Sequence, residues 1–373
     1  MKHLLKPLTA LIFILCLIAI PDISQSACAD AVNTCFTVLF PALFPFFVLS
    51  DIFVNSGGAN ILGKYLKFIM KPLFGISGNG AAAFILGMTS GYPVGAKVAS
   101  SLWESGEISK NEAERLVYFC NNSGPMFIIG ALGAGIFHSQ KAGVFLYIIH
   151  ILASATLGMI LKSYGKSTSL CPKGGTTRKT QVFTSAVESS IGAIIRVFAY
   201  VIFFAVIMEI FSFMGVFDLM SMGLGILGIH KSISVPLMKS LLEMTTGLKM
   251  LSASDNTLST KLIIASFSLG WSGLSIIFQS NSVTQKLNIN LKKYILARLC
   301  HGVIAAIYTF AAIKILNFNE AVFLNAVPSA TAYTSPYRPN VLLTYATGIA
   351  YIISWVRLKG TRPGLRQKRT ATR

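Results

Sequence analysis

Long stretches without a charged side chain are the feature that most limits what this chain can fold into. Residues 116–137, 142–161 and 262–285 contain no Asp, Glu, Lys or Arg, and residues 197–217 contain one, Glu209. A helix needs roughly 20 apolar residues to cross the hydrocarbon core of a membrane. Charged residues make up only 12% of the chain, against about 25% in soluble domains. The sequence therefore predicts an all-α polytopic membrane protein and argues against a soluble enzyme.

Gly and Pro interrupt two of the apolar segments. Residues 72–96 are uncharged but contain six glycines and two prolines, which disfavour one straight helix, and residues 219–250 also contain both residue types. We interpret both as re-entrant or broken helices, which need surrounding protein or a water-filled cavity at membrane depth. About eight full crossings accompany them, at residues 8–20, 35–54, 116–137, 142–161, 190–217, 262–285, 294–316 and 341–356.

A third interruption is expected inside residues 116–137. Ser109 and Glu112 form a capping box that starts the helix leading into this segment. Pro125 lacks the backbone N–H that a continuing helix needs, and Gly124 loosens the turn before it. A second half-helix should therefore begin near Pro125, with its exposed amide groups facing the interior of the protein.

Similar short strings occur in the two halves of the chain. Residues 86–91 (LGMTSG) parallel 242–247 (LEMTTG), and residues 122–125 (NSGP) parallel 271–274 (WSGL). Because Lys and Arg accumulate on the cytoplasmic side, residues 35–54 should run inward and residues 190–217 outward. The two repeats are therefore expected to be inverted. Inverted repeats with Gly- or Pro-broken segments in matching places indicate a secondary transporter.

The formal net charge of +19 is concentrated in one loop and in the C-terminal tail. Positive loops favour the cytoplasm, so both termini are expected there, and the tail is suited to contact anionic membrane lipid. No nucleic-acid-binding motif accompanies the charge, so we expect no nucleic-acid partner. Residues 1–27 also fit a cleaved signal peptide, but many later crossings favour an uncleaved anchor. We divide the chain into a signal-anchor helix (1–30), a first repeat (31–162), a basic cytoplasmic loop (163–185), a second repeat (186–316), a final loop and helix (317–356) and a basic cytoplasmic tail (357–373).

Two strings resemble a known family. These are Gly87 to Lys97 (GMTSGYPVGAK) and, after a Glu-Ala-Glu-Arg helix, Cys120 to Pro125 (CNNSGP). They resemble the sporulation integral membrane protein family YlbJ, which belongs with the nucleoside-recognition or Gate domain proteins and is more distantly similar to concentrative nucleoside transporters. The likeness extends over residues 31–315. It implies a protein of endospore-forming bacteria that moves dipicolinic acid across the outer forespore membrane.

A site for such a small planar dianion should offer backbone amides, hydroxyls, carboxamides and a cation, and helix N-termini attract anions. The candidates are Ser90, Gly91, Tyr92, Lys97, Asn121, Asn122, Ser123, Gly124, Glu243, Thr245, Thr246, Gly247, Ser272, Gly273 and Gln279. Alternatives stay open for three of these groups. The glycines also suit close helix packing, Lys97 could reach lipid headgroups, and Glu243 could pair with Lys239 or Lys249 instead of carrying a coupling proton.

No catalytic pattern competes with transport. His138, His150, His230 and His301 are scattered along the sequence, and no HExxH, GxSxG or nucleotide-binding GxxxxGK[ST] motif occurs. The six cysteines lack metal-binding spacing, although Cys28 and Cys35 flank a segment where a disulfide is chemically possible.

We therefore expect no enzyme activity, cofactor or metal. The prediction is a transporter of a small anionic metabolite, dipicolinate. The alternatives are a nucleoside transporter and a non-transporting scaffold or gate subunit. Homo-oligomers or partner membrane proteins are possible companions.

Overall fold

The computed structural model describes residues 2–163 and 182–315, and these residues form helices with no strand among them. Four helical segments are long and apolar enough to cross a membrane: α8 (Gln140–Leu161), α9 (Val182–Phe213), α15 (Leu291–Ile315) and the segment Leu258–Val283. Two bent helix pairs raise this number to six. The prediction of an all-α polytopic membrane protein is confirmed. The last apolar run (341–356), the tail and most of the basic loop lie outside the described residues.

Fewer straight crossings are present among the described residues than the seven expected there, because several segments are broken. Residues 116–137 do not form one span: α7 (Lys110–Cys120) ends before Asn121, and a π-helical segment, η4 (Met126–Ile136), follows Pro125. The capping box that starts α7 is present as predicted, with Ser109 and Glu112 bonded reciprocally.

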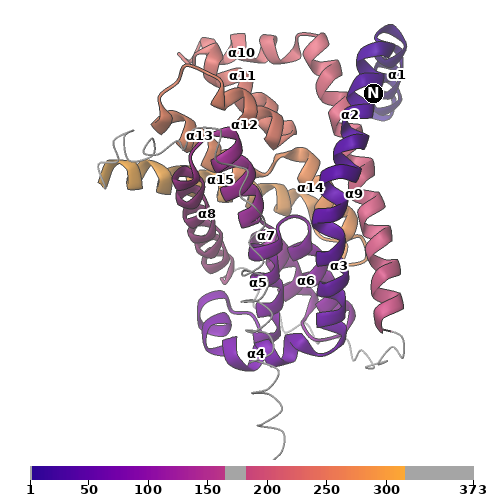
Figure 1. The fold of residues 1–373 in the computed structure, drawn as a ribbon, viewed down its shortest axis with the longest axis vertical. Coiled ribbons are helices and arrows are strands. Elements are labelled where there is room, and N and C mark those ends of the chain that lie inside the picture. The colour runs from indigo at the N-terminus through magenta and orange to yellow at the C-terminus, as the bar shows by residue number, and fades with distance from the viewer. Residues whose placement is uncertain (1, 164–181, 316–373) are drawn as a thin grey trace, which may run out of the picture. The chain divides into compact units, whose positions relative to one another are not determined.

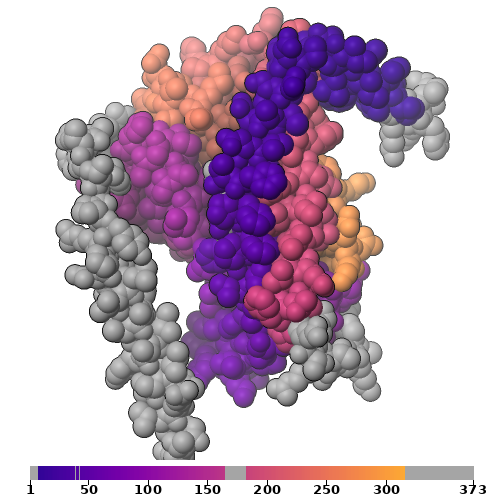
Figure 2. Space-filling model, turned by 45° about the vertical axis from the view of Figure 1, so that its right-hand side comes forward, coloured from indigo at the N-terminus to yellow at the C-terminus, as the bar shows by residue number. Residues whose placement is uncertain are grey.

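The N-terminal helices form a long arm beside α9. α1 (Lys2–Ala19) bends by 97° into α2 (Pro21–Thr34), which continues through a π-helical turn, η1 (Cys35–Leu39), into α3 (Phe40–Asn55). The π-helical turn ends two residues before Pro41, whose ring nitrogen carries no N–H for a continuing helix. Figure 2 shows this arm lying along α9. Cys28 and Cys35 are both free thiols.

The same order of elements occurs twice. Each copy has a long helix, a short bent helix, two helices joined at a break, two more joined at a second break, and a closing helix. The first copy contains α3, α4 (Gly58–Ile69) with η2 (Met70–Phe74), η3 (Gly78–Gly80), α5 (Ala81–Ser90), α6 (Val94–Glu104), α7, η4 and α8. The second contains α9, α10 (Val216–Gly225), α11 (Lys231–Leu242), α12 (Met244–Ser252), α13 (Leu258–Trp271), α14 (Gly273–Val283) and α15.

Matching caps support the correspondence between the two copies. A left-handed glycine turns the chain into both short bent helices, and a side-chain oxygen caps both the helix before the second break and the closing helix. The matched pairs are Gly57 with Gly215, Ser109 with Thr257, and Ser139 with Asn290. Because the same helix caps recur in the same order, the two halves are structural repeats of each other.

Equivalent helices of the two copies run in opposite directions. Figure 1 shows α3 leading down to α4, whereas α9 leads up to α10. This antiparallel pair is the arrangement expected of inverted repeats. α1 packs at the α10 end, where Phe13 contacts Phe211 and Cys16 contacts Met214. The helix that carries Lys64 and Lys67, α4, lies at the other end (Figure 1). The cytoplasmic position of the N-terminus stays a prediction.

The register of the repeat differs from the register of the similar strings. Residues 88–90 form the last turn of α5, directly before the break at Gly91, whereas residues 244–247 form the first turn of α12, after the break. The structural counterpart of Gly91 is therefore Glu243, four residues away from the position that the strings suggest. Gly95 and Gly247 then correspond, and each packs across its own break, against Gly87 and Ser240 respectively. Alignment on the strings was wrong because tertiary packing places the break.

Candidate functional site

Two breaks of the first repeat touch each other. The first lies at Gly91 to Pro93 between α5 and α6, and the second at Asn121 to Gly124 between α7 and η4. A Cβ atom on Gly91 would lie 2.9 Å from the backbone nitrogen of Gly124, and the φ of Gly91 is +87°. Only glycine allows this backbone approach. Close packing, the alternative that the sequence left open, thus explains this pair of glycines.

The second repeat holds its two breaks together in the same way. Glu243 separates α11 from α12, and Ser272, with a φ of +70°, separates α13 from α14. A Cβ atom on Gly273 would lie 3.1 Å from the carbonyl oxygen of Leu242 and 3.2 Å from the nitrogen of Met244. Each repeat therefore contains a contact between two interrupted helices.

Glu243 acts as the N-cap of α12. Its two carboxylate oxygens accept hydrogen bonds from the backbone N–H groups of Thr245, at 2.8 Å, and Thr246, at 2.7 Å. The carboxylate is half-buried, and none of the ion pairs within residues 2–163 and 182–315 involves it. The side chain thus occupies the helix N-terminus that the sequence suggested for an anion, and the side chains of Thr245 and Thr246 are exposed.

Arg298 in α15 joins the first repeat to the second. It is fully buried, and its Nη1 donates to the carbonyl oxygen of Asn121 at 2.9 Å and to Oδ1 of Asn122 at 3.3 Å. Its Nη2 donates to the hydroxyl of Tyr92 at 2.6 Å. That hydroxyl in turn donates to the carbonyl oxygen of Leu269 in α13, at 3.2 Å. One guanidinium therefore contacts both breaks of the first repeat.

The two adjacent carboxamides point to different repeats. Asn121 donates through Nδ2 to Ser280 at 2.6 Å and to the hydroxyl of Tyr294 at 2.8 Å, both in the second repeat. Asn122 donates to Ser154 at 3.0 Å, within the first repeat. Both side chains are fully buried. Each carboxamide thus has its own set of hydrogen-bond partners.

Two histidines meet beside this cluster. The rings of His150 in α8 and His301 in α15 stack at a centroid distance of 4.7 Å. The backbone N–H of Ser123 donates to Nε2 of His150 at 3.3 Å, and Nε2 of His301 lies 3.2 Å from the carbonyl oxygen of His150. The fold thus brings together two histidines that are scattered along the sequence, 151 positions apart.

Five buried polar atoms of the cluster have no hydrogen-bond partner. They are Nε of Arg298, Oδ1 of Asn121, Oγ of Ser123 and the Nδ1 atoms of His150 and His301. Unpaired buried polar atoms are rare and call for a specific explanation. Here they include N–H donors and lone-pair acceptors beside a buried positive charge. A polar ligand that both accepts and donates hydrogen bonds would satisfy these atoms.

The structure gives Lys97 an environment that the sequence did not suggest. Its ammonium lies 2.8 Å from Oδ2 of Asp51 in α3 and 3.2 Å from the hydroxyl of Ser190 in α9, and it sits over the ring of Phe47. Both members of the ion pair are buried. Lys97 thus ties α6 to the two long helices, and its contacts include none of the break residues.

The remaining predicted residues lie around the breaks. Gln279 is buried in α14, where it donates to Ser275 and neighbours Ser280, the partner of Asn121. Ser272 donates to the carbonyl oxygen of Trp271. Ser90, at the end of α5, has a buried hydroxyl without a partner. Gly247 is covered by Ser240 and Pro236, which is a packing contact.

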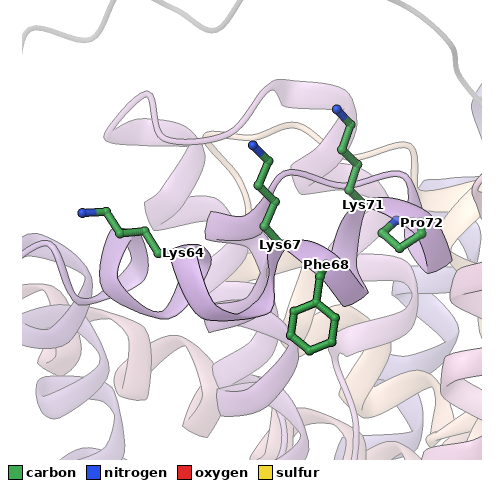
Figure 3. A pocket seen from close by; sticks show the side chains of 5 residues that line it. All are labelled: Lys64, Lys67, Phe68, Lys71 and Pro72. Carbon is green, nitrogen blue, oxygen red and sulfur yellow. The ribbon is translucent and has the colours of Figure 1, made fainter.

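A surface groove lies elsewhere, on α4 and η2. It has a volume of about 570 Å³ and is lined by Lys64, Lys67, Phe68, Lys71 and Pro72. Figure 3 shows Lys67 and Lys71 pointing one way and the Phe68 ring the other. None of the predicted site residues lines it. Since Asn121, Asn122 and Ser272 have no exposed surface, the centre formed by the breaks is closed in this structure.

Sequence reasoning missed Arg298, His150, His301 and Tyr294. A signal for Arg298 was present, because a charged residue inside an apolar span is costly and marks function by default, and Arg298 lies within the predicted crossing 294–316. The histidines gave no such signal, since their pairing depends on how α8 packs against α15.

The fold and the centre define a class of protein: a multi-pass integral membrane protein with two oppositely directed copies of a broken-helix unit. Comparisons with known proteins agree. The family model named Gate, described as nucleoside recognition, matches residues 36–167. The sporulation integral membrane protein YlbJ of Bacillus subtilis (strain 168) is 30% identical over 347 residues, covering 85% of this chain and 81% of that protein. The chain belongs to the YlbJ family of sporulation integral membrane proteins. No solved structure matches it.

Proposed function

We propose that this protein is a transporter of a small organic dianion, and that dipicolinate crossing the outer forespore membrane is its substrate. The observation that carries the proposal is the charge on Arg298. This guanidinium is fully buried, yet none of the ion pairs among the described residues includes it. A buried charge without a counter-ion is costly, so the site is suited to bind an anion.

The nitrogen atoms of the Arg298 guanidinium are placed so that a carboxylate of the ligand could bind them. Its Nε–H faces no acceptor, while both of its terminal nitrogens are engaged by the two breaks of the first repeat. A carboxylate that accepts a hydrogen bond from this N–H would also accept one from an Nη atom, because guanidinium and carboxylate groups pair in a bidentate way. Binding would then compete with the contacts that hold Asn121 and Tyr92. Anion binding would thereby loosen the breaks, which is the coupling that a carrier needs.

The Arg298 charge also favours an anion over a nucleoside. The Gate description and the buried carboxamides of Asn121 and Asn122 would suit a nucleobase, but a neutral ligand leaves the guanidinium without a counter-charge. We further propose that the protein works without catalysis, since carriage requires binding and release only. The basic lysines of α4 favour the cytoplasm for that end of the molecule.

Counterflow in liposomes tests the proposal. Vesicles containing the purified protein and loaded with unlabelled dipicolinate should accumulate labelled dipicolinate in a saturable manner. Isophthalate, which has the same two carboxylates on a benzene ring, should compete, and uridine should not. Competition by uridine alone would identify a nucleoside transporter. Absence of any flux, together with a copurifying membrane protein, would support the scaffold function instead.

A further inference from the structure

The histidine pair occupies a special position in the repeat. His150 follows the cap of α8, Ser139, by eleven residues, and His301 follows the cap of α15, Asn290, by the same number. The two imidazoles are therefore equivalent residues of the two copies. Since their rings stack on each other, they mark where one repeat meets the other. Both rings are buried.

The hydrogen bonds fix which nitrogen of each ring carries a proton. A backbone N–H can only donate, so Nε2 of His150 must offer a lone pair to Ser123, and its proton lies on Nδ1. A carbonyl oxygen can only accept, so Nε2 of His301 must carry a hydrogen toward the carbonyl of His150. The Nδ1 of neutral His301 is then a lone pair. Both Nδ1 atoms are buried without a partner, one a donor and the other an acceptor.

Proton uptake has different consequences at the two rings. His301 gains a proton on Nδ1 without losing its bond to the carbonyl oxygen of His150. His150 gains a proton on Nε2, where two N–H groups would then face each other and the bond to Ser123 would be lost. Ser123 belongs to the break between α7 and η4. Protonation of His150 thus acts directly on a break, whereas His301 can hold a proton with the structure unchanged.

The charge that faces this pair is Arg298. Among the residues described in the elements that pack around α8 and α15, it is the one whose charge acts on both rings. The phenols that lie nearby are Tyr92, bonded to Arg298, Tyr147, which donates to the carbonyl oxygen of Met88, and Tyr294, bonded to Asn121. No carboxylate among the described residues is recorded against either imidazole. Burial and the unpaired guanidinium both oppose a positive charge on the rings, so the empty site disfavours a proton on the pair.

An anion reverses this balance. A dianion beside Arg298 leaves one negative charge uncompensated in a site of low dielectric. One proton on the histidine pair makes the closed complex neutral. We propose that His150 and His301 form a proton-binding site that fills together with the dianion at Arg298, so that one proton crosses with each dianion. This inference rests on the proposed transport function.

The test combines counterflow with an imposed pH gradient in the same vesicles. With the acidic side facing the substrate, the gradient should accelerate wild-type dipicolinate uptake severalfold, and a dye in the lumen should report proton entry. His301→Gln keeps a donor toward the carbonyl of His150 but cannot titrate. It should lose both the acceleration and the proton entry, so that the counterflow it supports no longer responds to the pH gradient. His230→Gln, a change at an exposed histidine of α11's N-terminus, should behave like the wild type.

The outcomes separate the two proposals. Counterflow in wild-type vesicles without any proton entry, or an equal acceleration in His301→Gln, would overturn the proton site while leaving transport intact. Absence of wild-type counterflow would overturn transport and the proton site together. If His301→Gln does not fold, proton uptake by the wild type decides the question. Proton uptake by the detergent-solubilised wild type on adding dipicolinate needs no variant, and its absence would also refute the site.

Discussion

Replacing Arg298 by Lys tests the anion site most sharply, because the substitution keeps the charge and removes the planar fork. The guanidinium bonds two groups of the first repeat through Nη1 and Tyr92 through Nη2. A lysine ammonium is a single point charge that cannot reach both sides at once. We expect at least one charge-assisted hydrogen bond to be lost in the substrate complex, which is worth roughly 1.5–3 kcal/mol.

A free-energy loss of that size corresponds to a decrease of at least about tenfold in dipicolinate affinity. Counterflow measured against substrate concentration gives this value directly. Arg115→Lys is the matched control, since Arg115 is also buried but bonds only the carbonyl oxygens of residues 74, 75 and 161, away from the breaks. It should lower the thermal stability and leave the apparent affinity per folded protein unchanged. An Arg298→Lys affinity within about twofold of the wild type would refute the reasoning.

Three further outcomes are expected. Single cysteines at Lys67 and Lys231, placed in a cysteine-free chain, should react with an impermeant reagent from opposite sides of the membrane. Lys67 lies on α4 and Lys231 pairs with Asp218 of α10, and these two equivalent bent helices lie at opposite ends. Asp51→Asn should destabilise the protein by about 3–5 kcal/mol, since it strands the buried ammonium of Lys97, and adding Lys97→Met should restore much of the loss in thermal unfolding. Gly91→Ala should cost about 1–3 kcal/mol because its φ of +87° strains any side chain.

Controls and contrary results are available for each of these outcomes. Gly223→Ala, in the interior of α10 with open space around its Cβ position, should not destabilise the protein. Equal unfolding temperatures for Gly91→Ala and Gly223→Ala would contradict the packing of the breaks. Labelling of both cysteines from one side would contradict inverted repeats. An unchanged unfolding temperature in Asp51→Asn would show that the Lys97 ion pair does not stabilise the fold.

The positions of the helix breaks could be predicted from the sequence, but the residues that the breaks contact could not. The break at Asn121 to Pro125 was predictable because Pro and Gly act on the backbone locally, and the capping box at Ser109 is a local pattern too. The alignment of the two repeats could not be predicted in this way, because it depends on tertiary packing. The Met-Thr-(Ser/Thr)-Gly strings lie on opposite sides of their breaks.

The centre itself depends on contacts across the whole chain. Arg298 reaches Asn121 from 177 positions away and Tyr92 from 206. The contact of Lys97 with Asp51 and the stacking of the two histidines could not be predicted from the sequence either, because only helix packing brings these residues together. The sequence does contain one local signal for the centre: an arginine in the last predicted crossing of the second repeat needs a polar or charged partner there.

A structure determined with dipicolinate bound tests the central claim most directly. The claim is that the two helix breaks of the first repeat close around Arg298 and that an anion opens them. We expect a carboxylate of the ligand within hydrogen-bonding distance of Arg298, with the break at Asn121 to Gly124 moved away from Gly91. Ligand bound only in the surface groove of Lys64, Lys67 and Lys71, with Arg298 still bonded to Asn121 and Tyr92, would contradict the account.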